Sequence, residues 1–270
     1  MAKIAFLCVF FVDNFTQIAL TGGETYARVH SMDDLTLPHT ITSYECSADH
    51  LMKPEFFLHL CQEMAEEHAD LYNLGFGWAV QNHKIWVETQ GNYEFFRRPG
   101  WKETISLRTN TGQASPLQAR RFVEMTDKEG NVLARADLMW VLIDITTRRP
   151  FPLKRTDVAF KDKDCPPITA PMECPEWSAE PLCSVPHTAA RRDIDFNGHI
   201  NNSAYLIWAI DTLPAEHTPE GAPVRCHLTF RKECMLGNEV EVQHFRSGNF
   251  TRHIINSAEG VRAEVEIEWS

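Results

Sequence analysis

The stretch Asp-Phe-Asn-Gly-His-Ile-Asn-Asn at residues 195–202 decides how the second half of the chain is organised. Its two final asparagines are good N-caps, so we expect a helix to begin there and to cover residues 200–213. Strand-like segments follow this helix at residues 224–231, 238–245, 251–257 and 261–269. The last segment alternates apolar and polar residues, as a half-buried strand does. The second half is therefore predicted to be one helix followed by antiparallel strands.

The first half shows the same order. Residues 54–74 carry apolar positions at three- and four-residue steps, with Pro54 suited to the first helical turn and Gly75 to the end. Strand-like segments follow at residues 85–89, 104–108, 119–125 and 132–143, with a turn at residues 127–131. This order favours an α+β fold over alternating βαβ units. Because each half has too few strands to close a core alone, we expect the two halves to pair into one continuous sheet.

Composition excludes several classes of protein. The 270 residues are 43% hydrophobic and 23% charged, which is ordinary for a globular protein. The formal net charge of −11 argues against nucleic-acid binding, which needs clustered lysine and arginine. The eight cysteines show no zinc-ligand spacing and are expected to be reduced thiols of a cytoplasmic protein. With no glycine-rich phosphate loop either, no metal or organic cofactor is expected.

Four segments are expected along the chain. Residues 1–36 form an N-terminal extension, 37–159 a first domain, 160–182 a proline-rich linker and 183–270 a second domain. Within the extension, residues 4–12 resemble a short signal-sequence core, but they are too few to span a membrane. We favour Met32 as the natural start, with residues 1–31 as an upstream addition. No other segment is apolar and long enough for stable membrane insertion.

The stretch at residues 195–202 also carries chemistry. Asp195, Asn197 and His199 alternate, so an extended segment would place their side chains on one side, near the positive end of the following helix. A second element, Arg-Lys-Glu-Cys at residues 231–234, adds a carboxylate and a thiol. Hydrolysis of an acyl group needs an activated water or a carboxylate nucleophile, and a donor for the developing oxyanion, and these side chains could supply them.

Further markers accompany these two elements, at residues 75–77, 85–89, 98–101, 134–136, 140–141 and 147–149. In this order, the chain resembles the acyl-acyl-carrier-protein (acyl-ACP) thioesterases of the hotdog superfamily over roughly residues 37–270. The resemblance implies two tandem hotdog folds, each a long helix wrapped by an antiparallel sheet. It places the catalytic site in the second and the acyl-chain pocket largely in the first. It also implies hydrolysis of the thioester between a fatty acyl group and the phosphopantetheine of acyl carrier protein.

By this resemblance, four residues match the catalytic positions of the family: Asp195, Asn197, His199 and Glu233. In our hypothesis, His199 and Glu233 activate water and Asn197 holds that water or the substrate carbonyl. Asp195 either positions water or attacks the carbonyl to give an anhydride. A thiol nucleophile at Cys234 ranks lower, because neighbouring residues on a strand face opposite sides and Glu233 would take the site-facing position.

Two other groups of residues are candidates for substrate contacts. The acyl-pocket candidates are Met64, His68, Trp78 and Trp86, for which ordinary core packing is the alternative. The candidates for docking an acidic carrier protein are Arg148, Arg149, Lys154 and Arg155, for which solvated surface is the alternative.

Other functions compete with this interpretation. An acyl-CoA thioesterase of the wider superfamily is the second candidate, and a non-catalytic acyl-binding protein on the same scaffold is the third. A hotdog dehydratase would need a different arrangement of histidine and acid. The N-terminus does not resemble a plastid transit peptide, which favours a cytosolic bacterial member, acting as a monomer or a homodimer.

Overall fold

The computed structural model describes residues 34–156, 167–196 and 198–270. The predicted start at Met32 and nearly all of the N-terminal extension lie outside these ranges, as do residues 160–166 of the expected linker. Within the described residues, no helix has the length and apolar character needed to cross a membrane.

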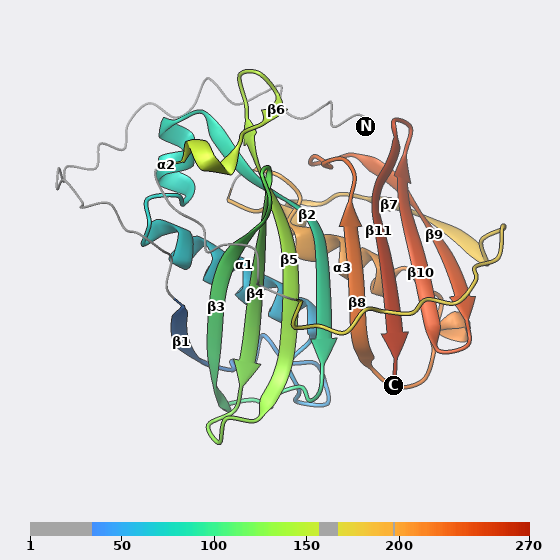
Figure 1. The fold of residues 1–270 in the computed structure, drawn as a ribbon. Coiled ribbons are helices and arrows are strands. Elements are labelled where there is room, and N and C mark those ends of the chain that lie inside the picture. The colour runs from blue at the N-terminus through green and yellow to red at the C-terminus, as the bar shows by residue number, and fades with distance from the viewer. Residues whose placement is uncertain (1–33, 157–166, 197) are drawn as a thin grey trace.

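The first half consists of one long helix, one short helix and a set of long strands (Figure 1). In chain order its elements are β1 (Leu35–Thr40), α1 (Pro54–Asp70), α2 (Phe76–Gln81), β2 (Lys84–Phe95), β3 (Thr104–Ser115), β4 (Gln118–Thr126), β5 (Val132–Asp144), β6 (Arg149–Pro150) and the 3-10 helix η1 (Leu153–Arg155). The four strands expected here are confirmed as β2 to β5, and most are longer than the sequence indicates.

The second half repeats this plan with shorter elements. They are β7 (Cys183–Thr188), the 3-10 helix η2 (Arg191–Asp193), α3 (Asn202–Asp211), the 3-10 helix η3 (Ala215–His217), β8 (Pro223–Phe230), β9 (Glu239–Ser247), β10 (Phe250–Ser257) and β11 (Gly260–Trp269). The expected helix and all four expected strands are present.

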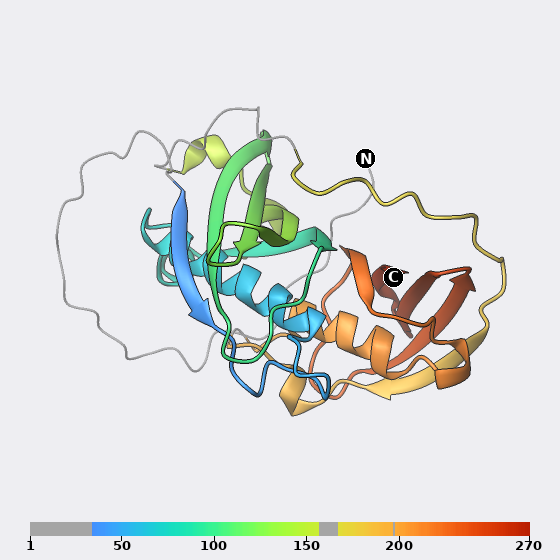
Figure 2. The ribbon, with the colours of Figure 1, turned by 90° about the horizontal axis from the view of Figure 1, so that it is seen from below.

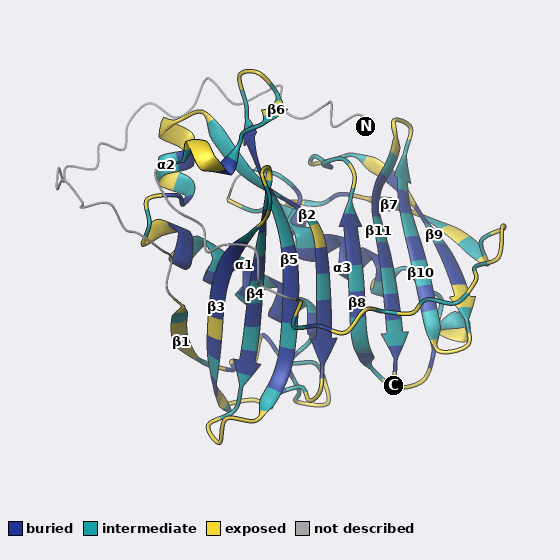
Figure 3. Ribbon diagram, in the orientation of Figure 1, coloured by how far each residue is buried: buried dark blue, intermediate teal, exposed yellow. Residues whose placement is uncertain are grey.

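All the long strands belong to one antiparallel sheet. Its order is β1-β3-β4-β5-β2-β8-β11-β10-β9-β7, and β6 pairs with β5. The halves join where β2 pairs with β8, with Gly91 opposite Leu228, so the expected continuous sheet is confirmed. Helices α1 and α3 lie beside each other on one side of the sheet (Figure 2), and the main hydrophobic core fills the space between. The central strands are largely buried, whereas β1 is partly exposed (Figure 3).

Helix α1 ends earlier than the sequence indicates. The helix stops at Asp70, not near Gly75. Asn73 adopts a positive φ of 55°, which breaks the helical path, and the Leu74 N–H returns to the Ala69 carbonyl at 2.9 Å. The chain then enters α2, a short helix that the sequence did not predict.

The two outermost strands, β1 and β7, were also not predicted. Each contains a proline, Pro38 in β1 and Pro186 in β7, and each reads Pro-His-Thr at its end. Proline has no N–H to donate, which a strand at the edge of a sheet tolerates. Both segments therefore form strands, although their prolines made a strand hard to predict from the sequence. The shared tripeptide places the same three residues at the corresponding end of the outermost strand in each half.

The loops before α1 and α3 have the same shape. An isolated bridge closes each loop, between Cys46 and Met52 in the first half and between Ile194 and Ile200 in the second. The helix begins two residues after each bridge. Inside the loops, His50 and Gly198 occupy the same position with φ of 63° and 79°.

The segments after β2 and β8 also correspond. In the first half the N–H groups of Phe96 and Arg97 donate to the Leu133 carbonyl; in the second, those of Arg231 and Lys232 donate to the Arg262 carbonyl. Each helix loop is bound to the segment after the strand, because the Met52 N–H donates to the Pro99 carbonyl and the Ile200 N–H to the Cys234 carbonyl. Arg98 therefore occupies the position equivalent to Glu233.

The correspondence extends into the strands themselves. Glu88 pairs with Trp140 at a bulge in β2, and Pro223 pairs with Trp269 at a bulge where β8 meets β11. Glu88 and Pro223 are therefore equivalent positions in the two halves.

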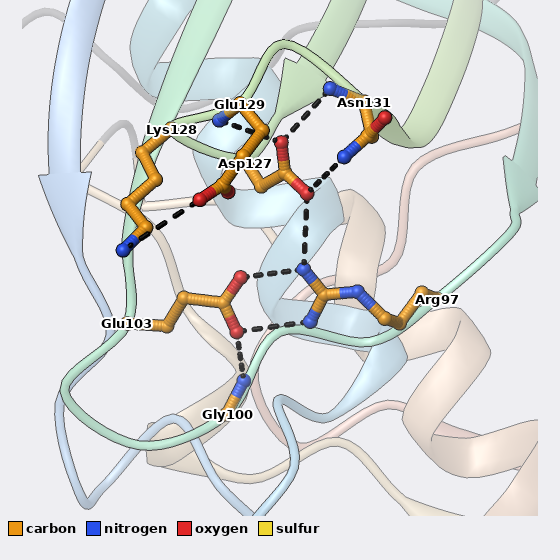
Figure 4. A network of polar contacts seen from close by, with 7 residues as sticks. All are labelled: Arg97, Gly100, Glu103, Asp127, Lys128, Glu129 and Asn131. Atoms are coloured by element: carbon orange, nitrogen blue, oxygen red, sulfur yellow. Dashed lines mark hydrogen bonds and ion pairs between the residues drawn. The ribbon is translucent and has the colours of Figure 1, made fainter.

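A network of ion pairs and hydrogen bonds holds the connection between β2 and β3 in place (Figure 4). The Arg97 guanidinium donates to both carboxylate oxygens of Glu103, at 2.9 and 2.6 Å, and lies 3.6 Å from Asp127. Asp127 belongs to the turn expected at residues 127–131, where its carboxylate accepts the N–H groups of Glu129 and Asn131. The network ties this connection to the β4–β5 turn, which keeps the segment that faces the α1 loop in place.

Candidate active site

The stretch at residues 195–202 forms a closed turn before α3. The Asp195 N–H donates to the His199 carbonyl (2.8 Å), and the His199 N–H donates back to Asp195 Oδ1 (3.1 Å). The expectation of an extended segment is therefore wrong: the Gly198 N–H donates to the Asp195 carbonyl at 3.0 Å, and the positive φ of Gly198, 79°, then turns the chain back toward Asp195. Asn197 lies outside the described residues, so its role stays a prediction.

The turn brings His199 beside Glu233 from the segment after β8. His199 Nε2 lies 3.5 Å from Glu233 Oε2, and the two side chains are 17% and 24% exposed. Glu233 is held by its backbone, because its carbonyl accepts from Arg262 Nη1 at 2.8 Å. The pair is therefore partly shielded yet open to solvent, an arrangement that suits acid/base chemistry.

Cys234, next to Glu233, is enclosed by protein. Its side chain is fully buried, and the thiol donates to Asn238 Oδ1 at 3.7 Å. Burial raises the pKa of this thiol above its ordinary value, so it is mainly protonated near neutral pH. A thiolate is the nucleophilic form of cysteine, so this environment favours the carboxylate route over a thiol nucleophile.

The first half of the chain contacts the turn at several points. The Phe196 ring packs edge-to-face on Phe76 at the start of α2, with ring centroids 4.9 Å apart. Two side-chain amides then reach across: Asn201 Nδ2 donates to Gln62 Oε1, and Asn202 Nδ2 donates to Glu88 Oε2, both at 2.9 Å. Sequence reasoning missed Gln62 and Glu88; the one signal was a carboxylate within the marker at residues 85–89.

The acyl-pocket candidates fall into two places. Met64 and His68 lie on the buried face of α1, and Arg121 Nη1 of β4 contacts His68 Nδ1 at 3.0 Å. Trp78 and Trp86 pack instead into a smaller cluster, with Ala119, Leu142 and Leu153 at its centre. The four candidates therefore lie in two separate places, two in each. Their contact with substrate stays a prediction.

The basic candidates gather at one end of the sheet. Arg149 of β6 and Lys154 and Arg155 of η1 are exposed, and Arg148 of the β5–β6 turn is partly exposed. The buried Leu153 anchors η1 to the same cluster that holds Trp78 of α2, so this basic group lies near α2 (Figure 1).

Fold and site together define a protein of two tandem hotdogs, with an imidazole and a carboxylate brought together in the second. Models of the acyl-ACP thioesterase N-terminal and C-terminal domains match residues 36–158 and 184–270. The chain therefore belongs to the acyl-ACP thioesterase family.

Relatives and solved structures agree. The chain is 27% identical over 225 residues to oleoyl-acyl carrier protein thioesterase 2 of Arabidopsis thaliana, covering 74% of this chain and 60% of that protein. It is 28% identical over 209 residues to a palmitoyl-acyl carrier protein thioesterase of Cuphea hookeriana, covering 72% of this chain and 50% of that protein. The matches thus span only about half to three fifths of these curated relatives.

Two solved structures share the fold. An acyl-ACP thioesterase from Bacteroides thetaiotaomicron superposes with a TM-score of 0.76 at 21% identity, covering 88% of this chain and 98% of that one. A 12:0-ACP thioesterase from Umbellularia californica gives 0.74 at 21% identity, covering 88% and 97%. These similarities establish the architecture of the chain.

Proposed function

We propose that this protein hydrolyses the thioester of fatty acyl-ACP, which releases a free fatty acid and ends chain elongation. The observation that carries the proposal is the pairing of His199 with Glu233 at 3.5 Å, at the turn where the family resemblance places catalysis. The six cysteines among the described residues are all free thiols, which supports a reducing, cytoplasmic location.

The geometry supports attack by water. In our proposal, His199 and Glu233 take a proton from water as its oxygen bonds to the thioester carbon. The carbon–sulfur bond then breaks, and the His199–Glu233 pair passes the proton taken from water to the departing thiolate. The N-terminus of α3 follows the turn directly, and its partial positive charge favours the negative charge that develops on the carbonyl oxygen. Asp195 accepts the His199 N–H through Oδ1 and so also shapes the turn.

The test of this function is release of free thiol from acyl-ACPs of several chain lengths, beside the matching acyl-CoAs. Faster turnover of acyl-ACP would support the proposal. Faster turnover of acyl-CoA would move the protein to the acyl-CoA thioesterases. A folded sample that hydrolyses neither would point to an acyl-binding role.

The carrier is proposed to dock on the basic group at the β5–β6 turn and η1. Single charge reversals, Arg149→Glu, Lys154→Glu and Arg155→Glu, are each expected to raise KM for acyl-ACP by about 3- to 10-fold with little change in kcat. The same changes should leave acyl-CoA kinetics unaltered, and the KM effect should shrink at high salt. Lys128→Glu, at a side chain that is 82% exposed on a distant turn, is the matched control. Equal KM values for all four variants would exclude this docking surface.

A further inference from the structure

We propose that Glu88 is a positioning residue of the catalytic site, whose carboxylate holds Asn202 and thereby the turn that carries His199. The proposal rests on the function proposed above for His199. Glu88 Oε2 accepts from Asn202 Nδ2 at 2.9 Å, and Oε1 accepts from the Tyr93 hydroxyl at 3.2 Å. Glu88 is 3% exposed and comes from β2 in the first half, whereas Asn202 is the first residue of α3.

Asn202 is well placed to transmit this contact. It lies three residues beyond His199, and the intervening Asn201 caps α3 by accepting the Ser203 N–H at 2.9 Å. The Asn201 N–H donates to the Asp193 carbonyl at 2.7 Å, which closes the base of the turn. A shift of the first residue of α3 therefore moves the backbone that orients the imidazole.

The internal repeat provides a comparison within the same molecule. In the loop before α1, Leu51 stands where the second half has His199, and Arg98 stands where it has Glu233. Arg98 forms an ion pair with Asp49 of its own loop. The first half thus keeps the shape of the turn and lacks the acid/base pair.

The supporting contact is missing from the first half as well. Pro54 stands where the second half has Asn202, and Pro223 stands where the first has Glu88. Neither proline side chain can form a hydrogen bond, and together with Ile210 they line a cavity of about 350 Å³. Because α1 begins without such a bond, the fold does not require one. The hydrogen bond between Glu88 and Asn202 is thus found at the helix that follows His199 and not at the equivalent helix of the other half.

Glu88 is also costly to bury, which argues against a role in packing alone. Burial raises the pKa of Glu88 to about 7, because the charged form loses its water. The groups that face it are the Asn202 amide from α3, the Tyr93 hydroxyl from β2 and the Cys61 thiol from α1. A Cβ at Gly91, three residues further along β2, would lie 2.7 Å from Glu88 Oε1, so a larger residue there would displace this carboxylate oxygen.

The experiment compares Glu88→Ala, Glu88→Gln and Asn202→Ala with Pro223→Ala, the matched change at the equivalent position of the other half. Glu88→Ala and Asn202→Ala are each expected to lower kcat by about 10- to 100-fold, with KM changed by less than about threefold. The Glu88→Ala/Asn202→Ala double variant should be no slower than either single variant, because each single change already removes the same hydrogen bond. Glu88→Gln keeps an acceptor oxygen and should recover most of kcat, whereas Pro223→Ala should match the wild type.

A readout independent of substrate separates this proposal from the proposed function. Amide hydrogen exchange of a peptide covering residues 193–205 should accelerate in Glu88→Ala and stay unchanged in Pro223→Ala. Unchanged exchange, additive kcat losses, or failure of Glu88→Gln to recover kcat would each overturn the positioning role. If the wild type hydrolyses no thioester but exchange responds as stated, the proposed function fails and the positioning of the turn stands. If Glu88→Ala does not fold, Asn202→Ala and Glu88→Gln decide the question by the same criteria.

Discussion

Replacing His199 with alanine is expected to lower kcat for acyl-ACP hydrolysis by about 10²- to 10⁴-fold, the usual contribution of a general acid or base. The physical reason is the loss of the imidazole that lies 3.5 Å from the Glu233 carboxylate. Glu233→Gln should have an effect of the same order, because an amide cannot take up the proton. The measurement is thiol release at saturating acyl-ACP, with far-ultraviolet circular dichroism to show that the variants are folded.

The internal repeat supplies the control for this prediction. Leu51 occupies the position of His199 in the first half, so Leu51→Ala tests a loop of the same shape that lacks the acid/base pair. It should leave kcat within about twofold of the wild type. Cys234→Ala should also be nearly as active, because the buried thiol is protonated. A folded Cys234→Ala protein without activity, beside an active His199→Ala protein, would reverse the assignment.

Protonation of two buried histidines is expected to destabilise the protein in mild acid. His244 of β9 and His253 of β10 face each other across the two strands; their Nδ1 atoms lie 2.7 Å apart, and both side chains are fully buried. Burial lowers the pKa of His244 from 6.5 to about 4, and the pKa of His253 is lowered well below 6.5 for the same reason. The unfolded chain therefore binds protons more tightly, and the contribution of the pair is complete above pH 6.5. It is lost progressively as the pH falls toward about 4, by about 3 kcal/mol for His244 alone.

The measurement is the free energy of unfolding by urea at several pH values between about 7 and 4. The comparison is a His244→Asn/His253→Asn protein, whose side chains hydrogen-bond but do not titrate. Glu88 contributes with the opposite sign, because its raised pKa favours the folded state at low pH, but it is present in both proteins and cancels in the difference. The difference should change by about 3 kcal/mol or more across this range. Parallel curves would show that the histidine pair does not titrate as expected.

Much of the fold could be predicted from periodicity, and the exceptions have physical causes. The strands of the central sheet were expected because their strand-like segments contain no proline, whereas β1 and β7 contain Pro38 and Pro186. The end of α1 was placed at Gly75 because glycine commonly ends helices, but Asn73 takes the positive φ first. Residue preferences at helix ends identify both Gly75 and Asn73 as possible ends of α1, but they do not decide between them.

The candidate site also contains residues that were predicted from the sequence and residues that were not. His199 and Glu233 were predicted as partners from the family pattern, and the structure places them together. Gln62 and Glu88 were not predicted, because each meets its asparagine across more than one hundred residues of sequence. Such contacts depend on how the halves pair, which alternation within a single strand does not reveal. The pairing register of β2 on β8, which only the structure gives, sets which residues of the two halves meet.

The prolines of the outer strands have a consequence for how the chain meets other chains. The outer side of an unpaired edge strand offers a row of backbone donors and acceptors to any extended segment that approaches. Pro38 in β1 and Pro186 in β7 each remove one donor from these strands and prevent the regular ladder from continuing. The same residue at the same place in both halves limits uncontrolled strand addition at both ends of the sheet. The substitutions Pro38→Val and Pro186→Val are therefore expected to supply the missing donors and to raise the tendency of the chain to associate through its outer strands.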